Sequence, residues 1–376
     1  MRPRFRLWAG LVIMTLVTSC KLFVLSAFPD LPGSPSWKFV GTQGFGVTNV
    51  AYTGIAIERA TGTVYVTFED GAYGARATVM SFTGGDWSYV GVPGFSANTT
   101  QFNCIALDST GTPYAAFMDV STGRADVMKY SSTLGWQSVG APDFSANTVI
   151  SMSFSIGANN VPYVAFTDST GQVVVESFNG SAWSVVGAPF GTNTSNVSLA
   201  LDNGNNPWVG FSDGSQGGNA TVMSFDGAAW NVVGSAGAAS TGAAYGISLA
   251  LDPGNRPYLA CSDASYSGLA VVTTFESGAW RAAGGAGFSA GVPYSASLVT
   301  SIVGVPLVAY ADGGGGAGGP AMLMTLAGGS WGAVGSQGFA PGNVQDTSLA
   351  LDRAGRLYVA FVDLGAGGKP SVMAYR

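Results

Sequence analysis

The sequence has no histidine among its 376 residues. Histidine is the general base of Ser-His-Asp and Cys-His nucleophilic sites and the commonest protein ligand of metals. Its absence excludes these catalytic arrangements and histidine-based metal sites. Carboxylates are therefore the only acid–base candidates.

Charge and cysteine are also scarce. Charged residues make up 10% of the chain, and the net charge is −6. A nucleic-acid-binding protein should show a basic face, and none is visible, so we expect no nucleic-acid partner. The sequence has no CxxC metal signal and no disulfide framework. Cys104 and Cys261 lie in apolar segments of different repeats, and we expect two buried free thiols and no cofactor.

Helical periodicity is missing as well, whereas tryptophan recurs at a nearly fixed interval. The shortest gap, from Trp136 to Trp183, is 47 residues, and the longest, from Trp280 to Trp331, is 51. A fixed period of this size indicates a repeat architecture. The seven repeat tryptophans are Trp37, Trp87, Trp136, Trp183, Trp230, Trp280 and Trp331.

Each repeat contains four short apolar runs, as residues 199–234 show, bounded by Gly, Asn, Asp or Pro. Four runs of strand length per repeat predict one four-stranded blade of a β-propeller, whose repeats span about 40–50 residues. The first hairpin of each repeat carries Gly or Asn at one position, which predicts a positive φ there. These residues are Gly62, Gly111, Asn160, Asn205, Asn255, Gly304 and Gly355.

The two ends of the repeat region complement each other. The last repeat ends at Arg376 without a Trp strand, and the Trp strand at 37–41 has no blade before it. We therefore predict an all-β, seven-bladed β-propeller over residues 37–376, closed by the N-terminal strand completing the last blade, and we expect a monomer. An open solenoid is the alternative, but it would leave both ends unfinished.

The first residues form a targeting segment with an arginine-rich start and an apolar stretch over 7–17. Val17-Thr-Ser-Cys20 then resembles the lipobox of bacterial lipoproteins. The resemblance implies a signal peptide at 1–19, a lipidated Cys20, and a linker to residue 36. It also implies an extracytoplasmic position in the bacterial cell envelope, at the outer membrane in a Gram-negative cell because Lys21 follows the cysteine.

Two alternatives for this segment remain open because residues 22–28 are apolar, whereas lipoprotein tethers are usually polar. One is an uncleaved membrane helix over 7–28, in which Lys21 would lie towards one end of the span. The other is cleavage after Ala27.

Two known repeat families resemble parts of this pattern. Residues 108–116 and 352–360 resemble the NHL motif, which pairs an Asp-x-x-Gly turn with a Tyr-Val-Ala strand; here the next Asp comes two residues later. The hairpin at 225–230 resembles the aromatic-turn-Trp half of a kelch repeat, without the kelch Gly-Gly doublet. The sialidase Asp-box is not matched. These resemblances imply a propeller family in which most members bind partners or ligands and a minority are enzymes.

Twelve of the 21 acidic residues fall into two repeated columns. One column closes the second strand of every repeat, on the face that carries the connections between blades: Asp70, Asp119, Asp168, Asp213, Asp263, Asp312 and Asp363. A ring of such side chains could form a cation site or a polar rim for glycan hydroxyls, so whether a metal binds is left open. A feature present in every blade first serves the blade, which favours hydrogen bonds to backbone N–H groups of neighbouring loops, such as 94–96 or 287–289. The other column is expected to stabilise Asx-type turns on the opposite face: Glu58, Asp108, Asp202, Asp252 and Asp352.

The loops after the second strands vary most between repeats, and such variation on a constant scaffold is typical of a binding surface. The candidate binding residues are Tyr73, Arg76, Arg124, Gln216, Asn219 and Tyr266. The repeat tryptophans could be sugar platforms, but packing at the outer strands is the favoured interpretation.

These observations predict a surface-anchored, non-enzymatic propeller that binds a protein or glycan through its loops. A carbohydrate-active hydrolase or lyase that uses rim carboxylates is the alternative. A purely structural component of the envelope is a third interpretation.

Overall fold

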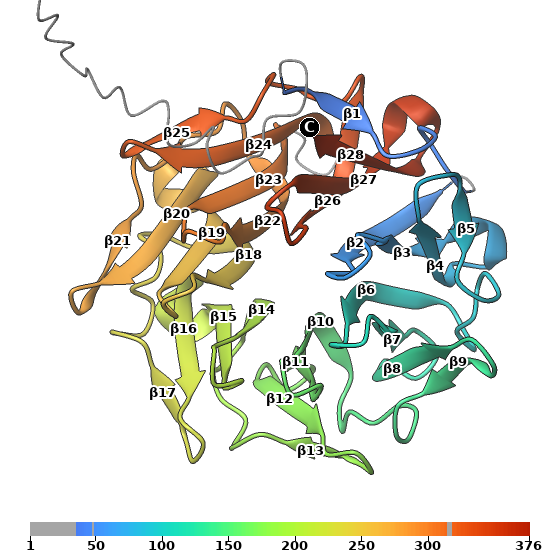
Figure 1. Ribbon diagram of the computed structural model, residues 1–376. Helices are drawn as coiled ribbons and strands as arrows, with labels where there is room; N and C mark the ends of the chain where they lie inside the picture. Colours follow the sequence, from blue (N-terminus) through green and yellow to red (C-terminus); the bar gives the residue numbers. More distant parts are fainter. Residues whose placement is uncertain (1–34, 47–48, 314–317) are drawn as a thin grey trace, which may run out of the picture.

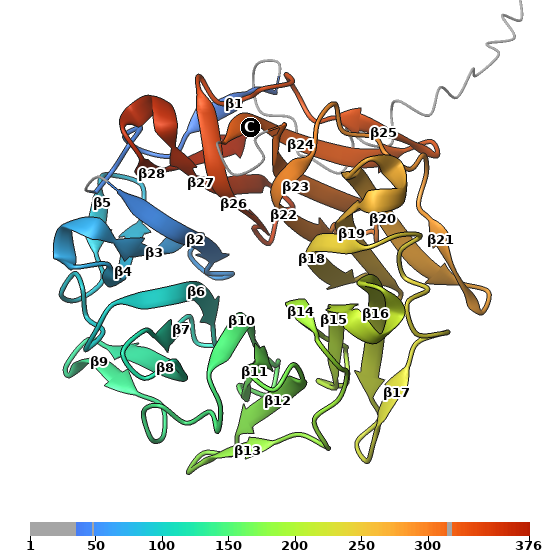
Figure 2. The same ribbon diagram turned by 180° about the vertical axis from the view of Figure 1, so that it is seen from behind.

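The computed structural model describes residues 35–46, 49–313 and 318–376. These residues contain 28 strands and four short 3-10 helices, and the strands form a ring around an open centre (Figure 1). Each first strand lies nearest the centre and each Trp strand lies at the outside, which Figure 2 shows from behind. The all-β propeller prediction is confirmed.

The first three blades run from residue 50 to 185. Blade 1 consists of β2 (Val50–Ile57), β3 (Val64–Asp70), β4 (Arg76–Phe82) and β5 (Trp87–Tyr89). Blade 2 consists of β6 (Thr100–Leu107), β7 (Pro113–Asp119), β8 (Arg124–Ser131) and β9 (Gly135–Ser138). Blade 3 consists of β10 (Val149–Ile156), β11 (Pro162–Asp168), β12 (Val173–Phe178) and β13 (Trp183–Val185).

The next three blades continue to residue 333. Blade 4 consists of β14 (Ser195–Leu201), β15 (Pro207–Asp213), β16 (Asn219–Phe225) and β17 (Trp230–Val232). Blade 5 consists of β18 (Ala244–Leu251), β19 (Pro257–Asp263), β20 (Leu269–Glu276) and β21 (Ala279–Ala282). Blade 6 consists of β22 (Pro293–Thr300), β23 (Pro306–Asp312), β24 (Gly319–Ala327) and β25 (Ser330–Ala333).

Blade 7 takes three strands from the end of the chain and one from its beginning. It consists of β26 (Asn343–Leu351), β27 (Leu357–Asp363), β28 (Lys369–Tyr375) and β1 (Trp37–Phe39). The 3-10 turns follow four of the second strands: η1 (Gly71–Tyr73), η2 (Gly214–Gln216), η3 (Ala264–Tyr266) and η4 (Leu364–Ala366). A short pairing of β24 with β26 joins blades 6 and 7 into one eight-stranded sheet.

The N-terminal strand closes the ring as predicted. β1 pairs antiparallel with β28, so that Trp37 lies opposite Tyr375 and Phe39 lies opposite Met373. Ser36 and Arg376 extend this pairing by exchanging two backbone hydrogen bonds. Closure removes the unpaired outer edge that β28 would otherwise present to other chains.

The repeat tryptophans tie each blade to the one before it. In all seven, the indole Nε1 donates a hydrogen bond of 2.7–2.8 Å to a carbonyl oxygen of the segment that follows the previous blade's outer strand. Trp37 donates to Val334 and Trp87 to Val40, so the circle continues across the chain ends. Five of the tryptophans also stack on a phenylalanine of the preceding loop, as Trp87 does on Phe45 at 3.8 Å. The packing interpretation of these residues is confirmed.

The glycine that ends each Trp-x-x-Val-Gly phrase is required on two grounds. Gly187 has φ +68°, a conformation that disfavours residues with a Cβ. A Cβ there would also lie 2.8 Å from Cδ1 of Trp230 in the next blade. The constant glycine therefore permits the close approach that the tryptophan hydrogen bond needs.

The inner strands are linked by a second set of bonds. Serine hydroxyls of one inner strand accept a backbone N–H from the next, as Ser198 does from Leu249 at 2.9 Å and Ser248 from Leu298 at 3.0 Å. Blades 1 and 2 carry Gly54 and Cys104 at this position, so they lack the serine acceptor and the inner ring is not uniform. Both amide atoms of Asn103, the residue before Cys104, are buried without a hydrogen-bond partner.

Three further expectations can be compared with the structure. All seven predicted turn positions have positive φ, from +63° to +85°. Cys104 and Cys261 are free thiols, as predicted; Cys261 is buried and Cys104 is partly buried. Burial raises the pKa of both thiols to about 12. Among the described residues, no helix has the length and apolarity to span a membrane. Cys20 and the alternatives for residues 7–28 lie outside the described residues.

Candidate functional site

The second-strand Asp column lies within the loop face, defined here as the face that carries the connections between blades. Six of its seven members are buried, with exposed fractions of 0–4%, and only Asp312 is partly exposed. Because the first strands lie nearest the centre, these second-strand residues are set back from the channel. The structure therefore places the column inside the blades and not as an open rim.

Several of the Asp carboxylates accept hydrogen bonds from two loops. Asp263 accepts from the N–H of Ser265, in the turn that follows it, and from the N–H groups of Thr241 and Gly242, all at 2.9 Å. Asp312 accepts from the equivalent loop N–H groups of Ala290 and Gly291, whereas Asp119 and Asp168 use the side-chain amides of Asn98 and Asn147.

The partner loops differ slightly from those predicted. The bonds come from the residues just after the turns at 94–96 and 287–289. The serines of those turns have another task, since Ser96 and Ser289 accept an N–H from the third strand of the preceding blade. Burial raises the pKa of Asp119, but hydrogen bonds from Ser121 and Asn98 outweigh it, so the net pKa lies below the usual value.

The first-strand column forms Asx-type turns, as predicted, on the hairpin face, which carries the turns between first and second strands. Asp202 Oδ1 accepts from the N–H groups of Gly204 and Asn206, both at 2.8 Å. Asp108, Asp252 and Asp352 repeat this pattern, and Glu58 instead accepts from the hydroxyl of Thr61.

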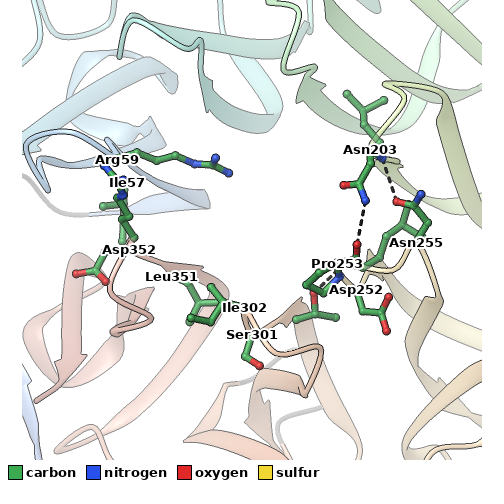
Figure 3. A pocket seen from close by; sticks show the side chains of 14 residues that line it. Ile57, Arg59, Asn203, Asp252, Pro253, Asn255, Ser301, Ile302, Leu351 and Asp352 are labelled. Atoms are coloured by element: carbon green, nitrogen blue, oxygen red, sulfur yellow. Dashed lines mark hydrogen bonds between the residues drawn. The ribbon is translucent and has the colours of Figure 1, made fainter. Parts of the chain in front are cut away.

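A large cavity, here called the channel mouth, opens on the hairpin face (Figure 3). Its volume is about 790 Å³. The last residues of five inner strands form an apolar collar, in which Thr300 stands where the other four blades have an aliphatic residue. The collar residues are Ile57, Leu201, Leu251, Thr300 and Leu351. The size is in the range of small-molecule and short-peptide sites.

One position per repeat supplies the side chains above this collar. It is the residue directly after the first-column position. In blades 1 to 7 its occupants are Arg59, Ser109, Ala158, Asn203, Pro253, Ile302 and Arg353. Five of the seven line the cavity, and these belong to blades 4, 5, 6, 7 and 1. The sevenfold pattern is thus broken at the channel mouth.

The variable side chains are arranged unevenly around the channel mouth. Arg59 extends toward the middle of the cavity, and Asn203 and Asn255 lie across from it (Figure 3). Ile302 is 66% exposed although it is apolar. Within the described part of the chain, no hydrogen-bond or ion-pair partner is found for the side chains of Arg59 and Arg353.

The carboxylates at the channel mouth are already engaged. Asp252 is 8% exposed, anchors its turn through two N–H groups, and pairs with Arg256 at 3.0 Å. Asp352 anchors its own turn and lies 3.8 Å from the Nε of Arg356. Neither carboxylate is placed to exchange a proton with a ligand.

A smaller cavity of about 380 Å³ lies on the loop face between blades 1 and 2. It contains Tyr73 and Arg76, two of the predicted binding residues, together with Asn98, Val120 and neighbouring residues. Tyr73 is 41% exposed and contacts Tyr89 edge-on at 6.4 Å. This loop-face cleft is where the structure brings sequence-predicted residues together.

The other predicted loop residues do not join this cleft. Gln216 and Tyr266 are exposed on blades 4 and 5, and Asn219 is partly exposed at the start of β16. Arg124 donates a hydrogen bond to the carbonyl of Ser145, so it supports the neighbouring loop. The four residues therefore lie outside the cleft, with Gln216 and Asn219 close together on blade 4 and the other two on blades 2 and 5.

Three carboxylates gather on blade 2, where one oxygen from each of Asp119, Asp126 and Asp143 lies within 4.8 Å of the others. Asp126 occupies the position of Thr78 in blade 1 and Thr221 in blade 4, and it accepts a hydrogen bond from the N–H of Asp143. Asp143 has φ +54° and stands where most other repeats have a glycine of positive φ. Burial, followed by the nearby carboxylates, raises the pKa of Asp126 to about 6 against the lowering effect of the Asp143 N–H. The spacing could hold a cation, and it is the one such cluster among the described residues.

Sequence reasoning missed the channel mouth and this carboxylate cluster. Both were detectable as departures from the repeat. The position after the first column varies from Arg to Ile, Asp126 is acidic where the other repeats have uncharged residues, and Asp143 is acidic where five other repeats have Gly. What the sequence did not provide was the distance between residues on different blades.

Comparisons with known proteins support the fold but assign no chemical activity to this chain. No family model and no curated protein matches the sequence. The structure is similar to YCF48 bound to a D1 peptide, with a TM-score of 0.57 and 11% identity over 93% of this chain and 99% of that one. It is also similar to an ulvan lyase bound to an oligosaccharide (TM-score 0.54, 11% identity, 90% and 94% of the two chains). A lectin from Aleuria aurantia in complex with Fucα1-6GlcNAc gives a TM-score of 0.51 at 16% identity over 77% and 97%. At these identities the likenesses show the β-propeller fold alone.

Proposed function

We propose that this chain is a non-enzymatic binding propeller that takes a protein or glycan ligand at the channel mouth. The observation that carries the proposal is the variable position above the collar. A constant scaffold holds seven turns in register, and the five residues of this position that line the cavity are of four different types. Variation in a cavity lining on a constant scaffold is typical of a recognition surface.

The state of the carboxylates favours binding over hydrolysis. A glycosidase of the usual kind needs two carboxyl groups about 5–10 Å apart that can reach a substrate. The mouth carboxylates Asp252 and Asp352 hold turns and arginines, and the second-strand column is mostly buried. A rim-carboxylate mechanism would have to break the hydrogen bonds that hold the loops.

The loop-face cleft is a second candidate site, favoured by its cavity and by the exposed Tyr73 and Arg76. The proposal also keeps the surface anchor, with Cys20 lipidated and the propeller held outside the cytoplasm. The sequence of residues 1–20 supports this anchor. Mass spectrometry of the membrane fraction tests it, and an unmodified Cys20 would end that part of the proposal.

Peptide and glycan arrays probed with the full chain test the site. Ile302→Arg places a charge in the channel mouth and should abolish binding of any array ligand. Leu134→Arg is the matched control, because Leu134 is an exposed aliphatic residue (70%) in the turn before β9 of blade 2. Binding that is unchanged in Ile302→Arg would contradict the mouth as the site. Turnover of a bound ligand by the unaltered chain would contradict the non-enzymatic role.

A further inference from the structure

The channel mouth has a basic side and an apolar side. Following the variable position around the ring, blades 5 and 6 contribute Pro253 and Ile302, and blades 7 and 1 contribute Arg353 and Arg59. Inner strands of successive blades contact one another, so these four residues form one continuous arc. The two apolar members lie on one half of the arc, and the two arginines lie on the other.

The basic half is available for an anion. Guanidinium groups bind carboxylates through paired, charge-assisted hydrogen bonds. Among the described residues, Arg59 and Arg353 form no ion pair, because Asp252 and Asp352 lie against Arg256 and Arg356 and Glu58 accepts from Thr61. Two guanidinium groups of the cavity lining are therefore free to meet an anionic ligand.

The apolar half of the channel mouth offers a surface for an apolar group of the same ligand. Ile302 stands exposed above a collar in which Leu251 and Leu351 supply further apolar surface. No aromatic residue is among the described residues that line the cavity, so the stacking surface that sugar rings commonly use is missing there. An anionic group next to an aliphatic group therefore fits this site better than a glycan does.

We infer that the channel mouth recognises the carboxyl terminus of a polypeptide whose last side chain is aliphatic. The terminal carboxylate lies between Arg59 and Arg353, and the last side chain packs on Ile302 and the collar. Amide groups of Asn203 and Asn255 lie across the cavity, where the preceding peptide units would pass. This inference rests on the proposed function, since it names the ligand of the same site.

The test uses the full chain immobilised on beads and two pools of hexapeptides that are random at five positions and end in Leu. One pool has a free carboxylate and the other a carboxamide. The free-carboxylate pool should be retained about tenfold or more over the amide pool, the factor expected for hydrogen bonds to a charged group. Arg59→Gln and Arg353→Gln should each remove most of this preference for the free carboxylate over the carboxamide. Arg281→Gln, an exposed arginine of β21 in the outer strand of blade 5, should keep it. A third pool that ends in Asp should be retained less than the Leu pool, and Ile302→Asn should reduce that difference.

Several results would overturn the inference. Equal retention of the two Leu pools shows that the terminus is not read, and a preference that survives Arg59→Gln with Arg353→Gln places the contact elsewhere. Arginine-dependent binding of oligogalacturonate in place of the Leu pool assigns the channel mouth to acidic glycans. If an array ligand is lost in Ile302→Arg while the free-carboxylate preference is absent, the proposed function stands and the carboxyl-terminus inference falls. If Ile302→Arg has no effect on any ligand, both fall. Tryptophan fluorescence of each variant verifies that the ring is intact.

Discussion

Glu176 stands at a buried position that other blades fill with an uncharged side chain. Glu176 pairs with Val185 of β13, which lies two residues after Trp183. In every blade, the residue that pairs with the second residue after the tryptophan is the equivalent of Glu176. Five blades have methionine there and blade 5 has Thr273. The Glu176 residue is 5% exposed, and burial is the sole cause that raises its pKa to about 7.

The size of the effect follows from this pKa. A shift from 4.5 to about 7 corresponds to roughly 3 kcal/mol, at 1.36 kcal/mol per pH unit. Because the folded protein binds this proton more tightly than the unfolded chain, folding stability falls as the pH rises from 4.5 to about 7 and stays low above that. Glu176→Gln removes the ionisation and should be more stable than the unaltered chain at pH 8 by up to about 3 kcal/mol. At pH 4 this advantage should vanish.

Urea unfolding of the full chain, followed by tryptophan fluorescence at pH 4, 6 and 8, measures these differences. Glu176→Met restores the residue of the other blades and should add a pH-independent gain from packing. Glu276→Gln is the matched control, because the side chain of Glu276 is 59% exposed and its replacement should have little effect at any pH. A gain for Glu176→Gln of equal size at pH 4 and pH 8 would refute the reasoning, as would no gain at pH 8.

Three other substitutions have defined outcomes in the same unfolding assay. Asp126→Thr should stabilise the protein at pH 8 by about 1 kcal/mol after solvent screening is allowed for, and by nothing at pH 3.5, because the raised pKa of Asp126 penalises only its charged form; a loss of stability at pH 8 would contradict this. Trp230→Phe removes the donor to Val186 and should cost about 1–2 kcal/mol at every pH; an unchanged urea midpoint would show that this bond contributes little. Gly187→Ala and Gly217→Ala both place a Cβ at φ +68°, which costs roughly 1–2 kcal/mol. Only Gly187→Ala also meets Trp230, so it should cost a further 1–3 kcal/mol, and equal losses in the two variants would rule out that contact.

The architecture could be predicted because its signals recur in every repeat. The interval between tryptophans gives the blades, and the unmatched strand at Trp37 gives the closure, since a ring leaves no strand over. The positive φ of residues such as Asn205 follows from local turn chemistry alone. Each of these inferences uses residues that are close in sequence or repeated at one spacing.

The site was harder to predict because it depends on contacts between blades. Arg59 and Arg353 appear in the sequence as ordinary turn residues at opposite ends of the chain, and only closure makes their blades neighbours. The Asp column was correctly placed at the ends of the second strands, but sequence does not report the burial that separates Asp263 from the channel. Asp143 was overlooked because its meaning comes from a comparison with glycines in other repeats.

The pairing of β1 with β28 means that the ring cannot close until the last strand of the propeller has been made. β1 is the first strand of the propeller in the chain and β28 is the last. A nascent chain therefore carries Trp37 without its acceptor on Val334 until six blades have emerged. A chain that stops early leaves blade 7 with open strand edges, which proteases and chaperones recognise. The shared blade thus makes closure of the ring depend on both ends of the propeller being present.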